Sequence, residues 1–163
     1  MPNWSKAINK RCADQLNGET STAGAFLHPA GTVAKTVGYS ALGGLVGAGV
    51  GVSVGEQLTK RRRAENQNAG DAGIAADFPG QNVVLGLTDT RLVVFSHSAM
   101  MGKPKNLVAA YPLDDIAAMD IHAAKTLHKK VRLFFTDESA VDFDAPKGSQ
   151  IDDFCVALNQ ALQ

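Results

Sequence analysis

The chain has 163 residues, of which 45% are hydrophobic and 20% are charged. These fractions exclude an intrinsically disordered chain, because apolar burial can offset the entropy lost on folding, and the length fits one domain with an additional segment. Sixteen Lys and Arg residues balance sixteen Asp and Glu residues, so a dedicated nucleic-acid binder, which is normally basic, is not expected. Two cysteines exclude a disulfide scaffold.

The charge is unevenly distributed along the chain. Residues 1–63 contain eight basic and three acidic residues, which gives this part a formal charge of +5 and leaves −5 for the remainder. The first dozen residues mix Lys6, Lys10 and Arg11 with single apolar positions. That order is not typical of a secretory signal, so a cytoplasmic location is predicted.

An amphipathic helix is predicted over residues 4–16. Its apolar stripe recurs at four-residue steps and consists of Trp4, Ile8, Cys12 and Leu16. Asn17 and Gly18 then provide a left-handed stop. We expect the stripe to pack on the body of the protein, and the alternative is a face that docks on a membrane surface or a partner. A short strand is predicted over residues 20–28.

A glycine-rich segment follows this strand. Residues 36–55 carry no charge and include four glycines at four-residue spacing, Gly43, Gly47, Gly51 and Gly55. Such a row removes side chains from one helical ridge, so that another backbone can approach closely. The row resembles glycine-zipper membrane segments. A basic cluster follows, as a cytoplasmic juxtamembrane cluster would, and it consists of Lys60, Arg61, Arg62 and Arg63.

Two alternatives to membrane association stay open for this segment: tight packing within the protein or between copies, and a flexible loop. Seven glycines cost roughly 5 to 7 kcal/mol of helix propensity relative to alanine, so an isolated helix in water is not expected. A single transmembrane pass would place strands 20–28 and 82–88 on opposite sides of a bilayer. We therefore predict that residues 33–59 return to the side they left.

The predicted fold is an α+β domain after a linker over residues 64–80. Its strands are expected at 82–88, 91–96, 106–111, 116–123, 131–136 and 140–144, with turns at 89–90, 112–115 and 137–139. In the last strand Val141 and Phe143 should point inward, and Asp142 and Asp144 outward. A final helix is predicted to begin at a capping pattern formed by Ser149 and Asp152. Its apolar stripe consists of Ile151, Phe154, Cys155, Leu158 and Leu162.

These elements predict a bent antiparallel sheet, or partly open barrel, of about seven strands that is capped by the C-terminal helix. An N-terminal helix and a Gly-rich helical insert complete it. The predicted organisation is an N-terminal helix and first strand (1–31), the glycine-rich insert with its basic end (32–63), the linker (64–80) and the main domain (81–163).

Three stretches of the main domain carry a family resemblance: residues 87–95 (LTDTRLVVF), 111–116 (YPLDDI) and 131–138 (VRLFFTDE). They resemble the bacterial pleckstrin-homology-like domains over residues 80–163, together with 20–28 as the first strand. The sequence departs from the family at Glu138, where a glycine is usual in the last hairpin. The resemblance implies the fold just described and an interaction module without enzymatic activity, since these motifs specify fold better than function.

A second basic cluster consists of Lys125, Lys129, Lys130 and Arg132. The resemblance implies that such loops can bind an anionic head group, and the alternative is a solvated hairpin whose nearby carboxylates weaken the field. No catalytic motif, metal-ligand spacing or cofactor motif is found, so no catalytic residue, metal or cofactor is predicted. Only a pocket lined by His97 or His122 with carboxylates would favour an enzyme.

The leading hypothesis is a pleckstrin-homology-like interaction module that associates with the cytoplasmic face of the membrane through the glycine-rich segment. Its predicted partner is a membrane lipid or a protein, and nucleic acid is not expected. The alternative is a soluble self-assembling or scaffold protein, a homo-oligomer in which the glycine rows of two copies pack together.

Overall fold

The computed structural model describes residues 3–30, 73–98, 101–123 and 128–163. In this part of the chain, seven antiparallel strands form one open sheet, in the order β4-β3-β2-β1-β7-β6-β5. The strands are β1 (Ala23–Pro29), β2 (Val83–Leu87), β3 (Arg91–Ser98), β4 (Lys103–Pro112), β5 (Ile116–Ala123), β6 (Lys129–Phe135) and β7 (Ala140–Ala145). The open seven-stranded sheet confirms the predicted fold class.

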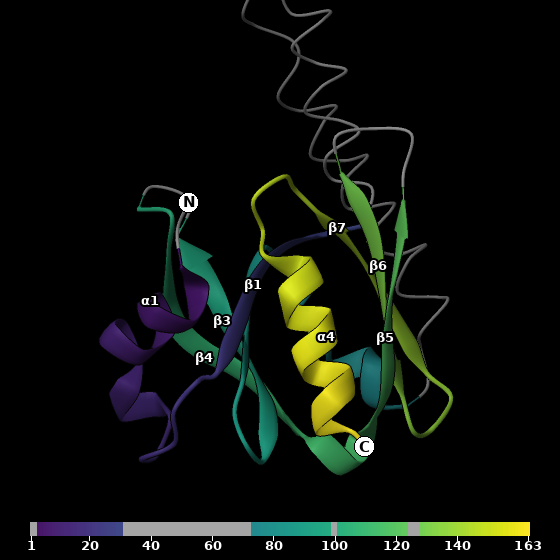
Figure 1. The fold of residues 1–163 in the computed structure, drawn as a ribbon, viewed down its shortest axis with the longest axis horizontal. Helices are drawn as coiled ribbons and strands as arrows, with labels where there is room; N and C mark the ends of the chain where they lie inside the picture. Colours follow the sequence, from purple (N-terminus) through teal and green to yellow (C-terminus); the bar gives the residue numbers. More distant parts are fainter. Residues whose placement is uncertain (1–2, 31–72, 99–100, 124–127) are drawn as a thin grey trace, which may run out of the picture.

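Two α-helices pack on this sheet, α1 (Trp4–Arg11) and α4 (Ile151–Ala161). Figure 1 shows α4 lying between β1 and β5, while α1 lies beside β3 and β4. The single helix α4 contacts β1, β2 and β5, although β5 stands at one edge of the sheet and β1 and β2 stand at its centre. The sheet is therefore bent around α4, as the sequence predicted.

The N-terminal helix forms as its spacing indicates. The Asn3 side chain accepts a hydrogen bond from the Lys6 backbone N–H and caps α1. A 3-10 turn, η1 (Ala13–Gln15), follows, and Asn17 and Gly18 end the segment with φ angles of 55° and 88°. All four residues of the predicted stripe are buried, and they pack against Val84, Val93 and Phe95 on one face of β2 and β3. The stripe therefore serves intramolecular packing in this structure.

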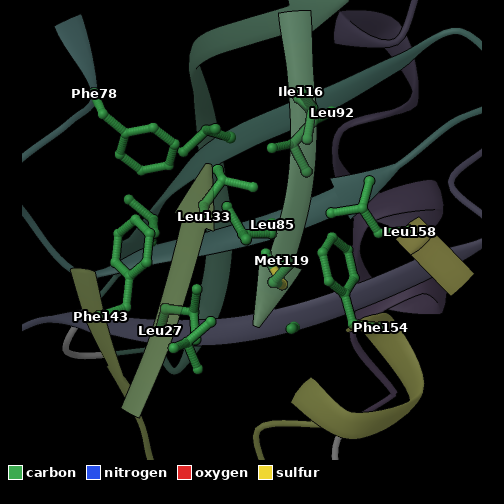
Figure 2. Packing of buried hydrophobic residues seen from close by; sticks show 14 of the residues in the cluster. Leu27, Phe78, Leu85, Leu92, Ile116, Met119, Leu133, Phe143, Phe154 and Leu158 are labelled. Atoms are coloured by element: carbon green, nitrogen blue, oxygen red, sulfur yellow. The ribbon is translucent and has the colours of Figure 1, made fainter. Parts of the chain in front are cut away.

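The main core lies on the opposite face of the sheet. Ile151, Phe154 and Leu158 of α4 are buried against strand residues, and Figure 2 shows Phe154 and Leu158 beside Met119 and Leu85. Full burial of each such side chain contributes about 1.5–3 kcal/mol. The apolar stripe predicted for the final helix is thus its core face, with Cys155 and Leu162 half-buried at the margin.

The start of α4 differs from the prediction. Its N-cap residue is Gln150, at a φ of 62°, and the Gln150 side chain makes no capping hydrogen bond to the helix. Ser149 is buried, and its carbonyl oxygen accepts a hydrogen bond from the Phe26 backbone N–H. The Gln150 side chain instead accepts a hydrogen bond from the Trp4 backbone N–H at 2.9 Å. The prediction of a Ser149–Asp152 cap is wrong, because packing against β1 and α1 sets the conformation here.

The end of the predicted linker belongs to the core. A 3-10 turn, η2 (Ile74–Asp77), is fixed to the β6–β7 turn because the Ile74 backbone N–H donates to the Asp137 carboxylate at 2.6 Å. Phe78 is buried and stacks on Tyr111 with ring centroids 5.5 Å apart. Residues 31–72, which include the rest of the predicted linker and the four spaced glycines, lie outside the described residues.

The remaining turns agree with the sequence. Residues 89–90 join β2 to β3, and a 3-10 turn, η3 (Leu113–Asp115), joins β4 to β5. In the β6–β7 hairpin Glu138 has a φ of 68°. It occupies the left-handed conformation for which glycine is usual.

Candidate functional site

The described part of the second basic cluster lies on β6, and each of its cations faces a carboxylate. Lys129 contacts both oxygens of Asp152 on α4 at 2.5 Å. Arg132 makes two hydrogen bonds to Asp142 on β7, at 2.6 and 2.8 Å, and the hydrogen bond to Asp142 raises the pKa of the guanidinium. Lys125 lies outside the described residues.

The third cation of the cluster, Lys130, pairs with Asp144. The side chain of Asp144 is only 2% exposed, whereas that of Asp142 is 49% exposed. Asp144 was predicted to point outward, as Asp142 was, but its side chain is buried. It does lie on the same side of β7 as Asp142, but it faces His28 of β1 and Lys130 of β6 in the strand register and is covered there.

These partners reduce the field that an anionic ligand would meet at β6. An exposed pair such as Arg132–Asp142 contributes only about 0–1 kcal/mol to stability. The main effect of the Asp142 carboxylate is to neutralise the positive charge of Arg132. The sequence already contained a signal for this charge pairing, because alternate residues of β7 are acidic while alternate residues of β6 are basic. The register that joins them was not evident. An anionic ligand at this cluster stays a prediction.

A different group of side chains surrounds the start of α1. We call it the Trp4–His97 cluster, and it consists of Trp4, Phe26, His28 and His97. Phe26 lies at its centre, with ring-centroid distances of 5.5 Å to Trp4, 4.7 Å to His28 and 4.3 Å to His97. The Trp4 and His97 rings meet edge to face at 6.0 Å. From the sequence, His97 could be identified only as a hypothetical pocket residue, and no local pattern placed it against Trp4.

The polar atoms of this cluster are unequally satisfied. His28 Nδ1 lies 2.9 Å from the side-chain oxygen of Asn82. By contrast, Trp4 Nε1 and His97 Nδ1 are both buried and have no hydrogen-bond partner in the part of the chain that the structure describes. Burial lowers the pKa of His97, and positive charge on His28 lowers it further. The neutral imidazole is therefore the form that this packing favours.

Arg91 has a structural role at the start of β3. Its guanidinium bonds the Glu19 carboxylate at 3.1 Å and the Leu16 carbonyl oxygen at 3.2 Å. Hydrogen bonds from Thr88 and from Arg91 and Thr90 lower the pKa of Glu19. The hydrogen bond from Arg91 to Leu16 ties the end of the N-terminal segment to the β2–β3 turn.

The cysteines are packed rather than exposed. Cys12 is buried with Sγ 3.6 Å from the Lys105 carbonyl oxygen, and Cys155 Sγ lies 3.1 Å from the Met119 carbonyl oxygen. Burial raises the pKa of both thiols, which disfavours the nucleophilic thiolate. Over the described ranges, no group of three or more His, Cys, Asp or Glu residues is arranged to hold a metal ion.

The membrane prediction rests on residues outside this part of the structure. None of the described helices has the length and hydropathy needed to cross a bilayer. The glycine row and the cluster Lys60–Arg63 fall within residues 31–72 and are not described. The structure does show the elements that flank residues 31–72. These are β1 before the segment and η2 after it, and η2 is hydrogen-bonded to the β6–β7 turn.

Comparisons with known proteins concern the fold. The sequence matches no family model, and no curated protein matches it either. Among solved structures, the chain is similar to a DUF1696-family protein with a pleckstrin-homology domain from Shewanella loihica, at 14% identity and a TM-score of 0.39 over 50% of this chain and 71% of that one. It is also similar to a pleckstrin-homology domain from Shewanella amazonensis, at 13% identity and a TM-score of 0.39 over 49% and 74% of the two chains.

At this identity and TM-score, the two likenesses carry no argument about this chain. The class of the protein rests on its own architecture: an open, bent antiparallel sheet with an N-terminal helix on one face and a C-terminal helix in the core. This is the pleckstrin-homology-like arrangement that the sequence resemblance implied.

Proposed function

We propose that this chain is an interaction module, not an enzyme, whose folded body presents residues 32–63 to the cytoplasmic surface of a membrane. The observation that supports it is the pairing of β1 with β2, in which Ala23–Leu27 face Leu87–Val83. The chain enters residues 31–72 from β1 and returns from them to η2 and β2 of the same folded body. The segment is therefore an excursion whose two ends are both anchored.

This anchoring limits how the segment can meet a bilayer. An excursion that returns to its own side needs two arms, and each arm of about 10 to 12 helical residues reaches roughly 15–18 Å, about half the hydrocarbon core. The uncharged run 36–55 would insert shallowly. The cluster Lys60–Arg63 would then lie near the head groups, where each basic residue contributes about 1 kcal/mol of attraction to an anionic surface.

Cosedimentation of the full chain with lipid vesicles tests this function. We expect binding to phosphatidylcholine vesicles that contain phosphatidylserine, and weaker binding to phosphatidylcholine alone. A variant with Lys60, Arg61, Arg62 and Arg63 changed to alanine should lose the preference for anionic vesicles. The matched control changes Lys6, Lys10 and Arg11 of α1 to alanine. These residues lie outside the proposed segment, so the control should keep the preference.

Two results would overturn the proposal. One is a chain that stays in the supernatant with both kinds of vesicle. The other is a chain that sediments as a discrete oligomer without lipid and becomes monomeric when Gly47 is changed to leucine. The second result would favour the scaffold hypothesis, in which the glycine rows of two copies pack together.

A further inference from the structure

The Trp4–His97 cluster joins α1 to the sheet at the first residue of the helix. Trp4 is only 5% exposed and is the only tryptophan in the chain. Its ring stacks on Phe26 of β1 and meets His97 of β3 edge to face. Because α1 has eight residues, it is too short to stay helical in water without such contacts.

This contact contains two unsatisfied polar atoms. Trp4 Nε1 and His97 Nδ1 are both buried, and neither has a hydrogen-bond partner among the described residues. A buried polar atom without a partner weakens the contact that contains it. In protonated His97 both ring nitrogens carry a hydrogen, so Nδ1 is an N–H donor, and within the described part of the chain neither it nor the neighbouring indole N–H has an acceptor.

Among the described residues, the groups that face His97 do not compensate a positive charge. On β1 the neighbouring ionisable group is His28, which would repel it. On β4 the residue opposite is Pro104. Helix α1 contains basic residues and no acidic residue. The buried carboxylate of Asp144 faces His28 across β1 and β7, but it is paired with Lys130.

We propose that α1 is a proton-sensitive latch, in which protonation of His97 releases Trp4 and loosens α1 from the face of β2 and β3 formed by Val84, Val93 and Phe95. His97 has a pKa lowered from its ordinary value of 6.5 by burial. The folded contact therefore favours the neutral imidazole. The stability of this contact is fully present above pH 6.5, the ordinary pKa of histidine. It falls as the pH drops through the lowered pKa of His97 in the folded state.

Emission from Trp4 provides a direct readout in the full-length chain, since no other tryptophan is present. Between about pH 8 and about pH 5, the range in which histidines titrate, we expect the emission to shift to longer wavelength and quenching by acrylamide to rise several-fold. Circular dichroism of the strands should stay unchanged over the same range. His97→Phe keeps an aromatic ring without a titrating proton and should remove the transition.

A matched control is His122→Phe. His122 is exposed on β5 and lies opposite Lys130, away from α1, so this variant should keep the transition. Hydrogen exchange of the α1 amides in the unmodified chain gives a second measurement that needs no variant. After correction for intrinsic rates, protection of residues 4–11 should fall at the acidic end.

Three results would overturn the proposal. The first is Trp4 emission that does not change with pH in the unmodified chain. The second is the same transition in His97→Phe as in the unmodified chain. The third is loss of strand signal together with the change in emission, because that would show unfolding of the whole domain rather than release of α1.

Discussion

Glu138 has a left-handed backbone conformation, which is usual for glycine and not for glutamate. Its N–H donates to the Phe135 carbonyl oxygen at 3.2 Å, and the Phe135 N–H donates to the Ser139 carbonyl oxygen at 2.9 Å, which closes the β6–β7 turn. With a φ of 68°, Glu138 occupies a region in which a β-carbon clashes with the following carbonyl. The resemblance to the pleckstrin-homology-like domains has its one departure at this residue.

We predict that Glu138→Gly stabilises the protein. Relief of the left-handed strain should outweigh the extra entropy that glycine adds to the unfolded chain, for a net gain of about 0.5–1 kcal/mol. Urea unfolding measures the difference. Glu138→Ala is the control, because it removes the same side chain but keeps the β-carbon, and it should give no gain. Equal stability of the two variants would contradict this account.

Tyr111 shows the cost of burying a hydroxyl group. Its ring packs against Phe78 and Phe135, and its buried hydroxyl has no hydrogen-bond partner within the described ranges. Burial, with a further contribution from the negative charge of Asp77, raises the pKa of Tyr111 to about 12. The folded state therefore favours the protonated phenol, so ionisation of Tyr111 lowers the stability further as the pH rises above the ordinary pKa of 10.0.

Tyr111→Phe should accordingly be neutral or stabilising at neutral pH, by up to about 1 kcal/mol, because no hydrogen bond is lost. The advantage of the variant should grow in alkaline solution. Urea unfolding of both proteins at neutral and alkaline pH tests this, and all other titrating groups cancel in the difference. A constant difference across the alkaline range would show that the Tyr111 hydroxyl is not buried as described.

At the scale of elements, a side-chain amide hydrogen-bonds to backbone groups of each edge strand of the sheet. On β5, the Asn159 oxygen accepts from the Met119 N–H at 3.2 Å and its nitrogen donates to the Met119 carbonyl oxygen at 3.1 Å. On β4, the Gln15 oxygen accepts from the Leu107 N–H, and its nitrogen donates to the Lys105 carbonyl oxygen. Each amide replaces a neighbouring strand at one point and so blocks pairing there with another chain.

Asn159→Asp should destabilise the protein by about 1–3 kcal/mol, because the carboxylate cannot donate to the Met119 carbonyl oxygen. Gln160→Glu makes the same chemical change one residue later, at an exposed position of α4, and should have little effect. Thermal unfolding compares the two variants. Sedimentation of Asn159→Asp would also show whether the β5 edge now associates. Equal stability of the two variants would argue against closure of the edge by Asn159.

At the scale of the whole molecule, the pairing of β1 with β2 predicts the topology of the undescribed segment. Asp14 precedes residues 31–72 and Lys147 follows them, and both are exposed. Cysteines introduced at these two positions should therefore lie on the same side of any membrane. Neither Asp14→Cys nor Lys147→Cys should react with an impermeant maleimide in intact cells, and both should react after lysis. The unmodified chain, with its buried Cys12 and half-buried Cys155, gives the background. Reaction of one position from outside would contradict the topology.

Local pattern in the sequence was sufficient for most elements. The four-residue spacing from Trp4 to Leu16, the alternation along the strands and the short polar turns all act between residues close in the chain. They therefore predicted α1, the seven strands and the core face of α4. The candidate site was harder to predict from the sequence. The basic residues of β6 could be identified, but their carboxylate partners could not be assigned before the strand register was known.

Only the tertiary structure decided what each polar side chain faces. Asp142 and Asp144 have the same sequence pattern, yet only Asp144 is buried, because it pairs with Lys130 across the β6–β7 hairpin and lies opposite His28 of the distant strand β1. Ser149 was predicted to cap the final helix. Its carbonyl oxygen is instead hydrogen-bonded to β1, and Gln150 is the N-cap residue. The sequence by itself determined the elements and their apolar faces, because those depend on spacing along one segment. Hydrogen-bond partners, burial of charge and the Trp4–His97 cluster depend on segments brought together by folding.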